Sequence, residues 1–119
     1  MYLAGGSLDA KVTVPGKKHT VEFWFWPGIE QDGELLAIDG KSAMTAKNAK
    51  IKVWHHAAFV SDGKKAAAFI DGKPMATGEA VSLESFRIGG NFEGKIDEIA
   101  IYPRAMPIKK LYRPNKFSK

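Results

Sequence analysis

The sequence contains no cysteine, which excludes both a disulfide framework and a zinc site built from thiolates. Packing must therefore stabilise the 119-residue chain, and its composition of 45% hydrophobic and 11% aromatic residues is sufficient for one core. A chain of this length predicts one domain. Without cysteines, the sequence does not indicate whether the protein works in a reducing or an oxidising compartment.

Long apolar runs are also absent. No stretch approaches the ~18 consecutive apolar residues that a membrane-spanning helix needs. The start of the chain, Met1 to Gly6, lacks the basic region and hydrophobic stretch of an export signal. Two alternatives remain: the protein stays inside the cell, or the chain is a domain of a longer exported polypeptide.

Acidic residues are missing from the end of the chain. The last eleven residues hold no Asp or Glu and five basic residues, namely Lys109, Lys110, Arg113, Lys116 and Lys119. The rest of the chain balances 13 basic with 13 acidic residues. We expect residues 107–119 to form a basic tail or linker that can contact an acidic surface. No groove-reading or base-stacking motif accompanies it, so no nucleic-acid partner is expected.

Nucleophile and metal patterns are weak. The serines show no elbow motif, and no Gly-rich phosphate loop exists. His55 and His56 are adjacent on a predicted strand, so they project to opposite faces and cannot chelate one ion. We expect one imidazole to be half buried and hydrogen-bonded and the other exposed.

Alternating strands separated by turn residues dominate the sequence. In residues 21–26, Val21, Phe23 and Phe25 alternate with Glu22, Trp24 and Trp26, so one aromatic row must lie in the core. Asp-Gly pairs at 62–63 and 71–72 predict two consecutive hairpins. Residues 42–50 are a weak edge strand or a loop, and the next strand is expected from Ile51. The sequence predicts an antiparallel β-sandwich of roughly ten strands.

The end of this pattern is a Gly-rich turn, a strand and a proline. Gly89-Gly90-Asn91 supplies the turn. Alternation in the strand that follows places Lys95, Asp97, Ile99 and Ile101 on one face, and Ile96, Glu98, Ala100 and Tyr102 on the other. Pro103 ends the strand. Pro107 can open a helical turn in which Ile108, Leu111 and Tyr112 share a face that folds back on the sheet, and Pro114 stops it.

Four segments, in order, carry a resemblance to a known family. They are Val21–Pro27, Trp54–Val60, Phe69–Lys73 and the closing run from Arg87 to Met106 with its Arg-Ile-Gly-Gly and Phe-Glu-Gly-Lys-Ile-Asp-Glu motifs. The chain resembles a short, bacterial-type laminin-G-like domain of the concanavalin A-like lectin/glucanase superfamily. The resemblance implies a jelly-roll sandwich over residues 1–106. Because such domains are mostly extracellular and modular, it also favours an extracellular or periplasmic domain of a longer exported chain.

This family includes β-glucanases, which need two carboxyl groups about 5 to 10 Å apart. On the predicted closing strand Glu98 points away from Asp97, and Glu93 precedes the strand, so we expect no catalytic residues and no enzyme. Calcium is the family's usual ion. The turn residues Asp32, Asp39, Asp62 and Asp71 each precede glycine and are explained by turn geometry, so no cofactor is expected and calcium stays an unsupported alternative.

Binding remains as the predicted function. Trp24 and Trp26 share a face with Glu22, and indole rings stack on sugars while carboxylates accept from their hydroxyls. We expect Trp24 and Trp54 to be buried. For Trp26, burial and exposure are equally expected. Three polar residues near the Gly89-Gly90 turn complete the candidate ligand site: Arg87, Asn91 and Glu93. The sequence therefore predicts a non-catalytic glycan-binding module. The alternative is a structural or protein-interaction module.

Overall fold

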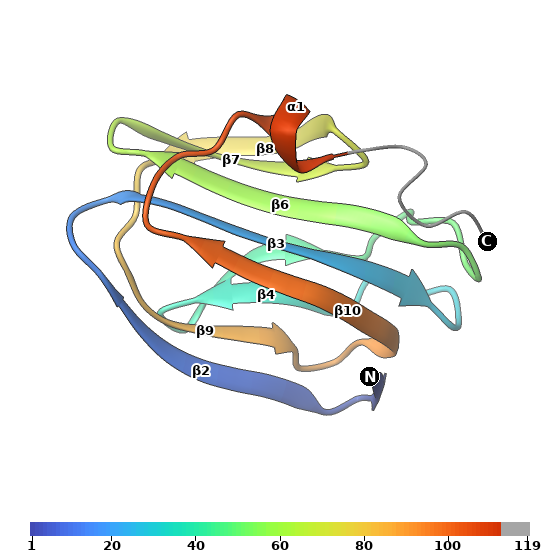
Figure 1. The fold of residues 1–119 in the computed structure, drawn as a ribbon. Coiled ribbons are helices and arrows are strands. Elements are labelled where there is room, and N and C mark those ends of the chain that lie inside the picture. Colours follow the sequence, from blue (N-terminus) through green and yellow to red (C-terminus); the bar gives the residue numbers. More distant parts are fainter. Residues whose placement is uncertain (113–119) are drawn as a thin grey trace.

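The computed structural model describes residues 1–112, which form two antiparallel sheets packed face to face and one short helix (Figure 1). The six-stranded sheet has the order β1-β10-β3-β6-β7-β8, and the four-stranded sheet has the order β2-β9-β4-β5. The elements are β1 (Tyr2–Ala4), β2 (Ser7–Val14), β3 (Lys18–Pro27), β4 (Glu34–Ile38), β5 (Lys41–Thr45), β6 (His55–Asp62), β7 (Lys65–Ile70), β8 (Lys73–Glu79), β9 (Leu83–Gly89), β10 (Glu93–Tyr102) and α1 (Ile108–Leu111). The predicted jelly-roll sandwich is confirmed.

The core lies between the two sheets and is built from alternate residues of each strand. On β3, Val21, Phe23 and Phe25 are fully buried and face the four-stranded sheet. Leu36 of β4 and Ile88 of β9 meet them from the other layer and are equally buried. One row of β3 is therefore core, as the alternation predicts, and the row with the tryptophans faces away from it.

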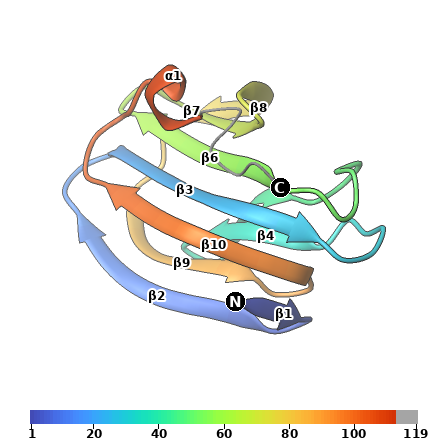
Figure 2. The same cartoon turned by 45° about the vertical axis from the view of Figure 1, so that its right-hand side comes forward.

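The two ends of the chain close the sandwich. β1 pairs with β10 in one sheet and β2 pairs with β9 in the other, so the blue and orange strands lie side by side (Figure 2). Glycine allows the close approaches at this seam. A Cβ on Gly89, which has φ 83°, would lie 2.7 Å from Leu3 Cδ1, and one on Gly94 would collide with the Trp26 carbonyl oxygen.

A β-bulge in β10 changes the predicted faces of this strand. The register with β3 shifts between Asp97 and Ala100, and Glu98 at the bulge has φ 50°. The extra residue reverses the alternation, so Asp97 shares a face with Ala100 and Tyr102 and not with Ile99 and Ile101. The prediction of the faces of β10 was therefore wrong after Asp97.

The strand expected from Ile51 begins four residues later. Residues 51–53 form a turn in which Lys52 has φ 57°, and β6 starts at His55. Trp54 precedes β6 and is half buried, not a core residue as expected. In residues 42–50, the edge-strand alternative is correct for β5, and a loop follows it.

The expectation for the histidine pair was also wrong. Both imidazoles are buried, with His55 8% and His56 0% exposed. The reason is that each face of β6 is covered: His55 stacks on Phe25 inside the sandwich, and Tyr112 lies near His56 outside it.

The chain after β10 folds back onto the six-stranded sheet (Figure 1). The Thr20 hydroxyl donates to the Arg104 carbonyl at 2.8 Å and accepts from the Met106 amide at 2.9 Å. Leu111 of α1 is then buried. The expected helical turn is therefore present at Ile108–Leu111. Pro114 and the basic residues Arg113, Lys116 and Lys119 lie outside the described residues.

Candidate functional site

The outer face, by which we mean the face of the six-stranded sheet that points away from the four-stranded sheet, carries the predicted tryptophans. Antiparallel register arranges its side chains in rows across β1, β10, β3 and β6. One row contains Tyr2, Lys95 and Trp26, which are direct partners across three strands. The next row contains Asp97, Trp24 and His56. The third contains Glu22, opposite Ala100 and Ala58.

The row of Tyr2, Lys95 and Trp26 is open to solvent. Tyr2 is 54% exposed, Lys95 is exposed and Trp26 is half buried. The Lys95 ammonium lies 4.4 Å from the centroid of the Trp26 ring, a cation–π contact. Gly28 leaves room at the edge of the row, because a Cβ there would lie 3.2 Å from the Tyr2 hydroxyl and 3.7 Å from Trp26 Cζ3. These aromatic and charged groups form an accessible platform.

The row with Trp24 is covered. Trp24 is 4% exposed, as expected, and packs at a centroid distance of 5.2 Å from His56 and 6.2 Å from Tyr112. Tyr112 fits above Gly72, whose added Cβ would lie 2.8 Å from the tyrosine ring. Trp24 is therefore part of the packing beneath the C-terminal segment and is not presented to a ligand.

Glu22 belongs to a hydrogen-bond network next to Trp24. Its Oε1 lies 2.8 Å from His56 Nε2, and its Oε2 accepts from the Tyr102 hydroxyl at 2.6 Å. The hydrogen bond to Glu22, with burial, raises the pKa of Tyr102. Because Glu22 is 8% exposed and both oxygens have protein partners, its carboxylate acts in packing and not in ligand contact.

The other three predicted residues lie at a different edge. Arg87 is on β9, on the exposed side of the four-stranded sheet, where its Nε donates to Asp9 Oδ1 at 2.7 Å. This hydrogen bond lowers the pKa of Asp9. Arg87 and Asn91 line an open depression at the β9–β10 turn. The structure therefore brings Arg87 near Asn91 but places them on another side of the sandwich from Trp26.

Glu93 begins β10 and contributes its backbone to the rim. Its amide donates to Gln31 Oε1 at 2.8 Å, and its carbonyl accepts from Gln31 Nε2 at 2.7 Å, so both backbone groups have partners within the protein. By alternation with Lys95 its side chain lies on the outer face, at the end of the platform. Of the three rim residues, Glu93 is the one that adjoins Trp26.

The bulge in β10 reopens the question of a carboxylate pair. Asp97 and Glu22 now lie on the same face of neighbouring strands, a placement that alternation along β10 alone did not predict. Glu22 is enclosed by His56 and Tyr102, so it is not available as an acid, base or nucleophile to a sugar. The arrangement is consistent with a non-catalytic module.

Within residues 1–112, no three His, Asp or Glu side chains are placed to hold a metal ion. His55 is instead paired with the turn residue Asp71: Nδ1 lies 2.7 Å from Asp71 Oδ2, and Nε2 lies 2.7 Å from the Lys50 carbonyl. Burial alone would disfavour the imidazolium, but these hydrogen bonds outweigh it and raise the pKa of His55. This pair stabilises the β7–β8 turn next to β6.

Sequence reasoning missed the partners that complete the platform. Tyr2 and Lys95 are 93 positions apart but adjacent across β1 and β10. Alternation along the two strands shows that Tyr2 and Lys95 are neighbours only when the register between β1 and β10 is known. Tyr2 lies in a short apolar start that carries no motif of its own, so no local signal could have identified it.

Comparison with solved structures shows the same sandwich in proteins of low sequence identity. Domain 4 of AbnA, a GH43 extracellular arabinanase from Geobacillus stearothermophilus solved with arabinotriose, superimposes with a TM-score of 0.66 at 18% identity, covering 92% of this chain and 73% of that one. A heptameric SAP-like pentraxin from Limulus polyphemus gives 0.61 at 14% identity, covering 88% and 73%. Trypanosoma rangeli sialidase gives 0.66 at 14% identity, covering 90% of this chain and 25% of the sialidase.

These similar structures include domains of enzymes as well as a pentraxin, so they establish the fold alone. A search of curated protein sequences finds no match. Helix α1 is too short to cross a lipid bilayer, and no other helix occurs in residues 1–112. The sequence matches the family described as the concanavalin A-like lectin/glucanases superfamily over residues 28–109. The chain thus belongs to the concanavalin A-like lectin/glucanase superfamily, in its laminin-G-type branch.

Proposed function

We propose that this chain is a non-catalytic carbohydrate-binding module whose glycan site is the platform of Tyr2, Lys95 and Trp26. The observation that carries the proposal is the exposed row itself, in which two aromatic rings flank one cation on a rigid sheet. The apolar C–H faces of a sugar stack on aromatic rings. Strand positions also hold their side chains more rigidly than loop positions do.

The polar groups around the platform suit sugar hydroxyls. Lys95 donates hydrogen bonds, and the exposed Asp97 and half-buried Glu93 share its face and accept them. Because the Lys95 ammonium rests over the Trp26 ring, a sugar that stacks there displaces it toward the solvent, where it can donate to a hydroxyl. Binding therefore replaces the cation–π contact between Lys95 and Trp26 with stacking of the sugar on Trp26 and hydrogen bonds to the sugar hydroxyls.

The arabinanase domain was solved with arabinotriose, so arabino-oligosaccharides are the first probes, followed by a panel of other oligosaccharides. We expect isothermal titration calorimetry to give saturable binding that Trp26→Ala weakens by roughly tenfold or more. Trp54→Phe is the matched control, because it removes an indole outside the platform and should leave the affinity unchanged. The absence of binding across the panel would refute the proposal.

Two further expectations belong to this proposal. Binding is expected to be independent of calcium, and titrations with calcium and with EDTA should give the same affinity. The parent polypeptide is expected to be exported, with this domain in an extracellular or periplasmic location. Calcium binding by the domain itself is testable without the glycan, because a bound ion would raise the melting temperature. Location is testable by fractionation of the source cells.

A protein-interaction role is the second candidate, and a different observation favours it. The sandwich has an uncapped side between the edge strands β5 and β8, and the glycan platform does not use this side. The basic residues of the tail, which we propose as a contact for an acidic surface, include Lys109 and Lys110 on α1, and both are exposed. The side between β5 and β8 and the glycan platform are on different sides of the domain, so one molecule could serve both roles.

A further inference from the structure

The side chain of Tyr2 lies along the outer face of the six-stranded sheet. Tyr2 belongs to β1, and Gly28 follows β3, with β10 between the two strands. A Cβ on Gly28 would lie 3.2 Å from the Tyr2 hydroxyl and 3.7 Å from Trp26 Cζ3. The tyrosine therefore reaches across β10, and its tip meets the edge of the indole above Gly28. The two aromatic side chains form one continuous surface.

This aromatic surface is one row deep. On one side, the row beyond it contains Ala4, Glu93 and Gly28, none of which carries an aromatic ring. On the other side, Tyr112 packs against Trp24, which is 4% exposed, so the indole of that row is not accessible. A ligand that stacks on both rings of the platform must therefore run along the row, across β1, β10 and β3 (Figure 2).

The length of this surface suits more than one sugar unit. Neighbouring strands lie about 4.8 Å apart, so the row extends over roughly 10 Å from β1 to β3. A pyranose chain with equatorial linkages is flat and advances by about one strand spacing per unit, so about two or three units cover the row. Axial linkages coil the chain and turn successive units away from one plane. On a flat surface, the equatorial chain keeps more of its units in contact.

From this geometry we infer that the platform takes the flat face of an extended, equatorially linked pyranose chain, which runs across the strands and stacks on both Tyr2 and Trp26. The inference rests on the proposed glycan site and adds to it the class of linkage and the direction of the chain. Lys95 lies between the two rings in the row, beside the middle of the bound chain. Gly28 determines specificity, because it has no side chain that would separate the two rings.

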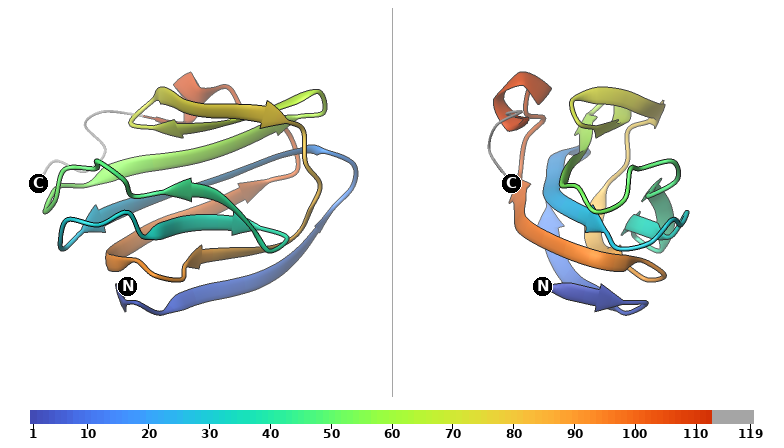
Figure 3. Two further views of the ribbon diagram at one scale, coloured as in Figure 1. Left: turned by 180° about the vertical axis from the view of Figure 1, so that it is seen from behind. Right: turned by 90° about the vertical axis from the view of Figure 1, so that its right-hand side faces the viewer.

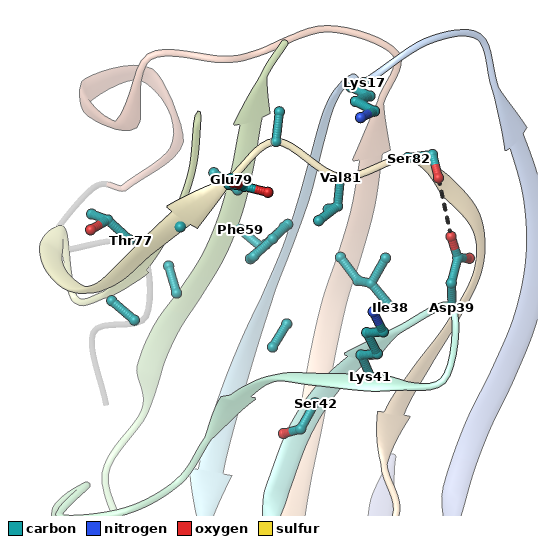
Figure 4. Close-up of a pocket in the computed structure, with 16 residues that line it drawn as sticks. Lys17, Ile38, Asp39, Lys41, Ser42, Phe59, Thr77, Glu79, Val81 and Ser82 are labelled. Atoms are coloured by element: carbon teal, nitrogen blue, oxygen red, sulfur yellow. Dashed lines mark hydrogen bonds between the residues drawn. The ribbon is translucent and has the colours of Figure 1, made fainter. Parts of the chain in front are cut away.

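A cleft between the edge strands β5 and β8 is the alternative place for an oligosaccharide (Figure 3). It has a volume of about 500 Å³, and Ile38, Phe59 and Val81 point toward one another in it (Figure 4). Phe59 is the one aromatic residue among the described residues that line it, and it is 8% exposed. The cleft therefore lacks the pair of accessible rings that the platform has, and positions on β8 provide controls.

Trisaccharides that share their units and differ in linkage test the inference. Cellotriose and maltotriose both consist of glucose, with equatorial linkages in the first and axial linkages in the second. Mannotriose with β linkages and mannotriose with α linkages form another pair. In calorimetric titrations we expect the equatorial member of the pair that binds to do so roughly tenfold more tightly, because it keeps both aromatic contacts. The affinity should also rise from the monosaccharide to the trisaccharide.

Two pairs of variants locate the contact. Tyr2→Ala should weaken binding of the equatorial trisaccharide about fivefold, whereas Met75→Ala, which removes another exposed side chain on β8, should not change it. Gly28→Ala should weaken binding because its Cβ displaces the Tyr2 hydroxyl, whereas Gly78→Ala on β8 meets no atom within 4 Å and should have no effect. Tyr2→Phe keeps the ring and should retain binding, which separates stacking from hydrogen bonding. Circular dichroism melting curves show whether each variant is folded.

The outcomes separate this inference from the proposed function. Equal affinity for the two members of a pair, tighter binding of the axial member, or unchanged binding by Tyr2→Ala would overturn the inference. The glycan site itself would still stand if Trp26→Ala weakened that binding. Binding that Met75→Ala or Gly78→Ala weakens and Tyr2→Ala does not would place the glycan at β8 and overturn both. The absence of binding by every saccharide would also overturn both.

Discussion

His55 illustrates how a single residue links two turns and gives the fold a pH dependence. Its imidazole bridges Asp71 and the Lys50 carbonyl and stacks on Phe25 at a centroid distance of 5.2 Å. The His56 amide donates to the other oxygen of Asp71 at 2.8 Å. Burial alone would raise the pKa of Asp71, but these hydrogen bonds outweigh it and lower that pKa.

The predicted consequence is a loss of stability at alkaline pH. A His whose folded pKa is raised stabilises the fold fully below its unfolded pKa of 6.5 and loses that contribution as pH rises through the folded value. His19, whose pKa is lowered by burial, has the opposite sign and destabilises the fold below pH 6.5. We therefore compare the wild type with His55→Gln, in which His19 is unchanged.

We expect His55→Gln to lower the free energy of unfolding by about 1–3 kcal/mol near pH 6. The difference from the wild type should shrink as pH rises to 9, because the wild type loses its imidazolium. Urea unfolding at pH steps from 5.5 to 9 measures this. A difference that stays constant over the range would show that the imidazolium does not contribute.

At the scale of elements, the helical turn α1 and the residue that follows it act as a cover over part of the outer face. Leu111 is buried, and Tyr112 packs on Trp24 and His56. Burial, followed by the charge of Asp71, raises the pKa of Tyr112. Sequence periodicity predicted the turn and its apolar face, because these depend on local spacing. It could not predict that the turn would cover Trp24 and leave Trp26 open.

Removing this cover should expose Trp24. Tyr112→Ala is expected to increase acrylamide quenching of tryptophan fluorescence and to cost about 0.5–1.5 kcal/mol of stability through lost aromatic contacts. Lys110→Ala is the control, because Lys110 is exposed on the same turn. Unchanged quenching in Tyr112→Ala would mean that Trp24 is shielded by other groups.

The bulge in β10 is the element-scale feature that sequence alternation did not predict. Glu98 adopts φ 50°, a backbone angle that residues other than glycine, Asn and Asp seldom adopt. The sequence therefore offered no turn signal there. The consequence is a change of face for every residue after Asp97. Predictions that rest on strict alternation hold up to such a bulge and reverse beyond it.

At the scale of the whole molecule, both sheets depend on pairs between the start and the end of the chain. Tyr2 pairs with Lys95, and Ser7 pairs with Gly89. Closing such loops costs entropy before the contacts compensate for it, so an all-β topology of this kind folds slowly.

We expect refolding on a scale of milliseconds to seconds, with the burial of Trp24 as the signal. Stopped-flow fluorescence after dilution from urea measures the rate, and Trp54→Phe tests that the signal does not arise at the start of β6. Refolding within microseconds would contradict the view that pairing of β1 with β10 and of β2 with β9 limits the reaction.

The sequence by itself determined the fold class, the buried row of β3 and most of the turns. These follow from two-residue alternation and from Gly and Asp-Gly conformations, which act over a few neighbouring residues. Only the tertiary structure decided that Tyr2 lies beside Lys95 and Trp26, that Arg87 lies away from Trp26, and that a cleft separates β5 from β8. Each of these depends on strand register, on the bulge in β10 or on the number of strands in each sheet. Long-range pairing determines these features, and local sequence does not encode them.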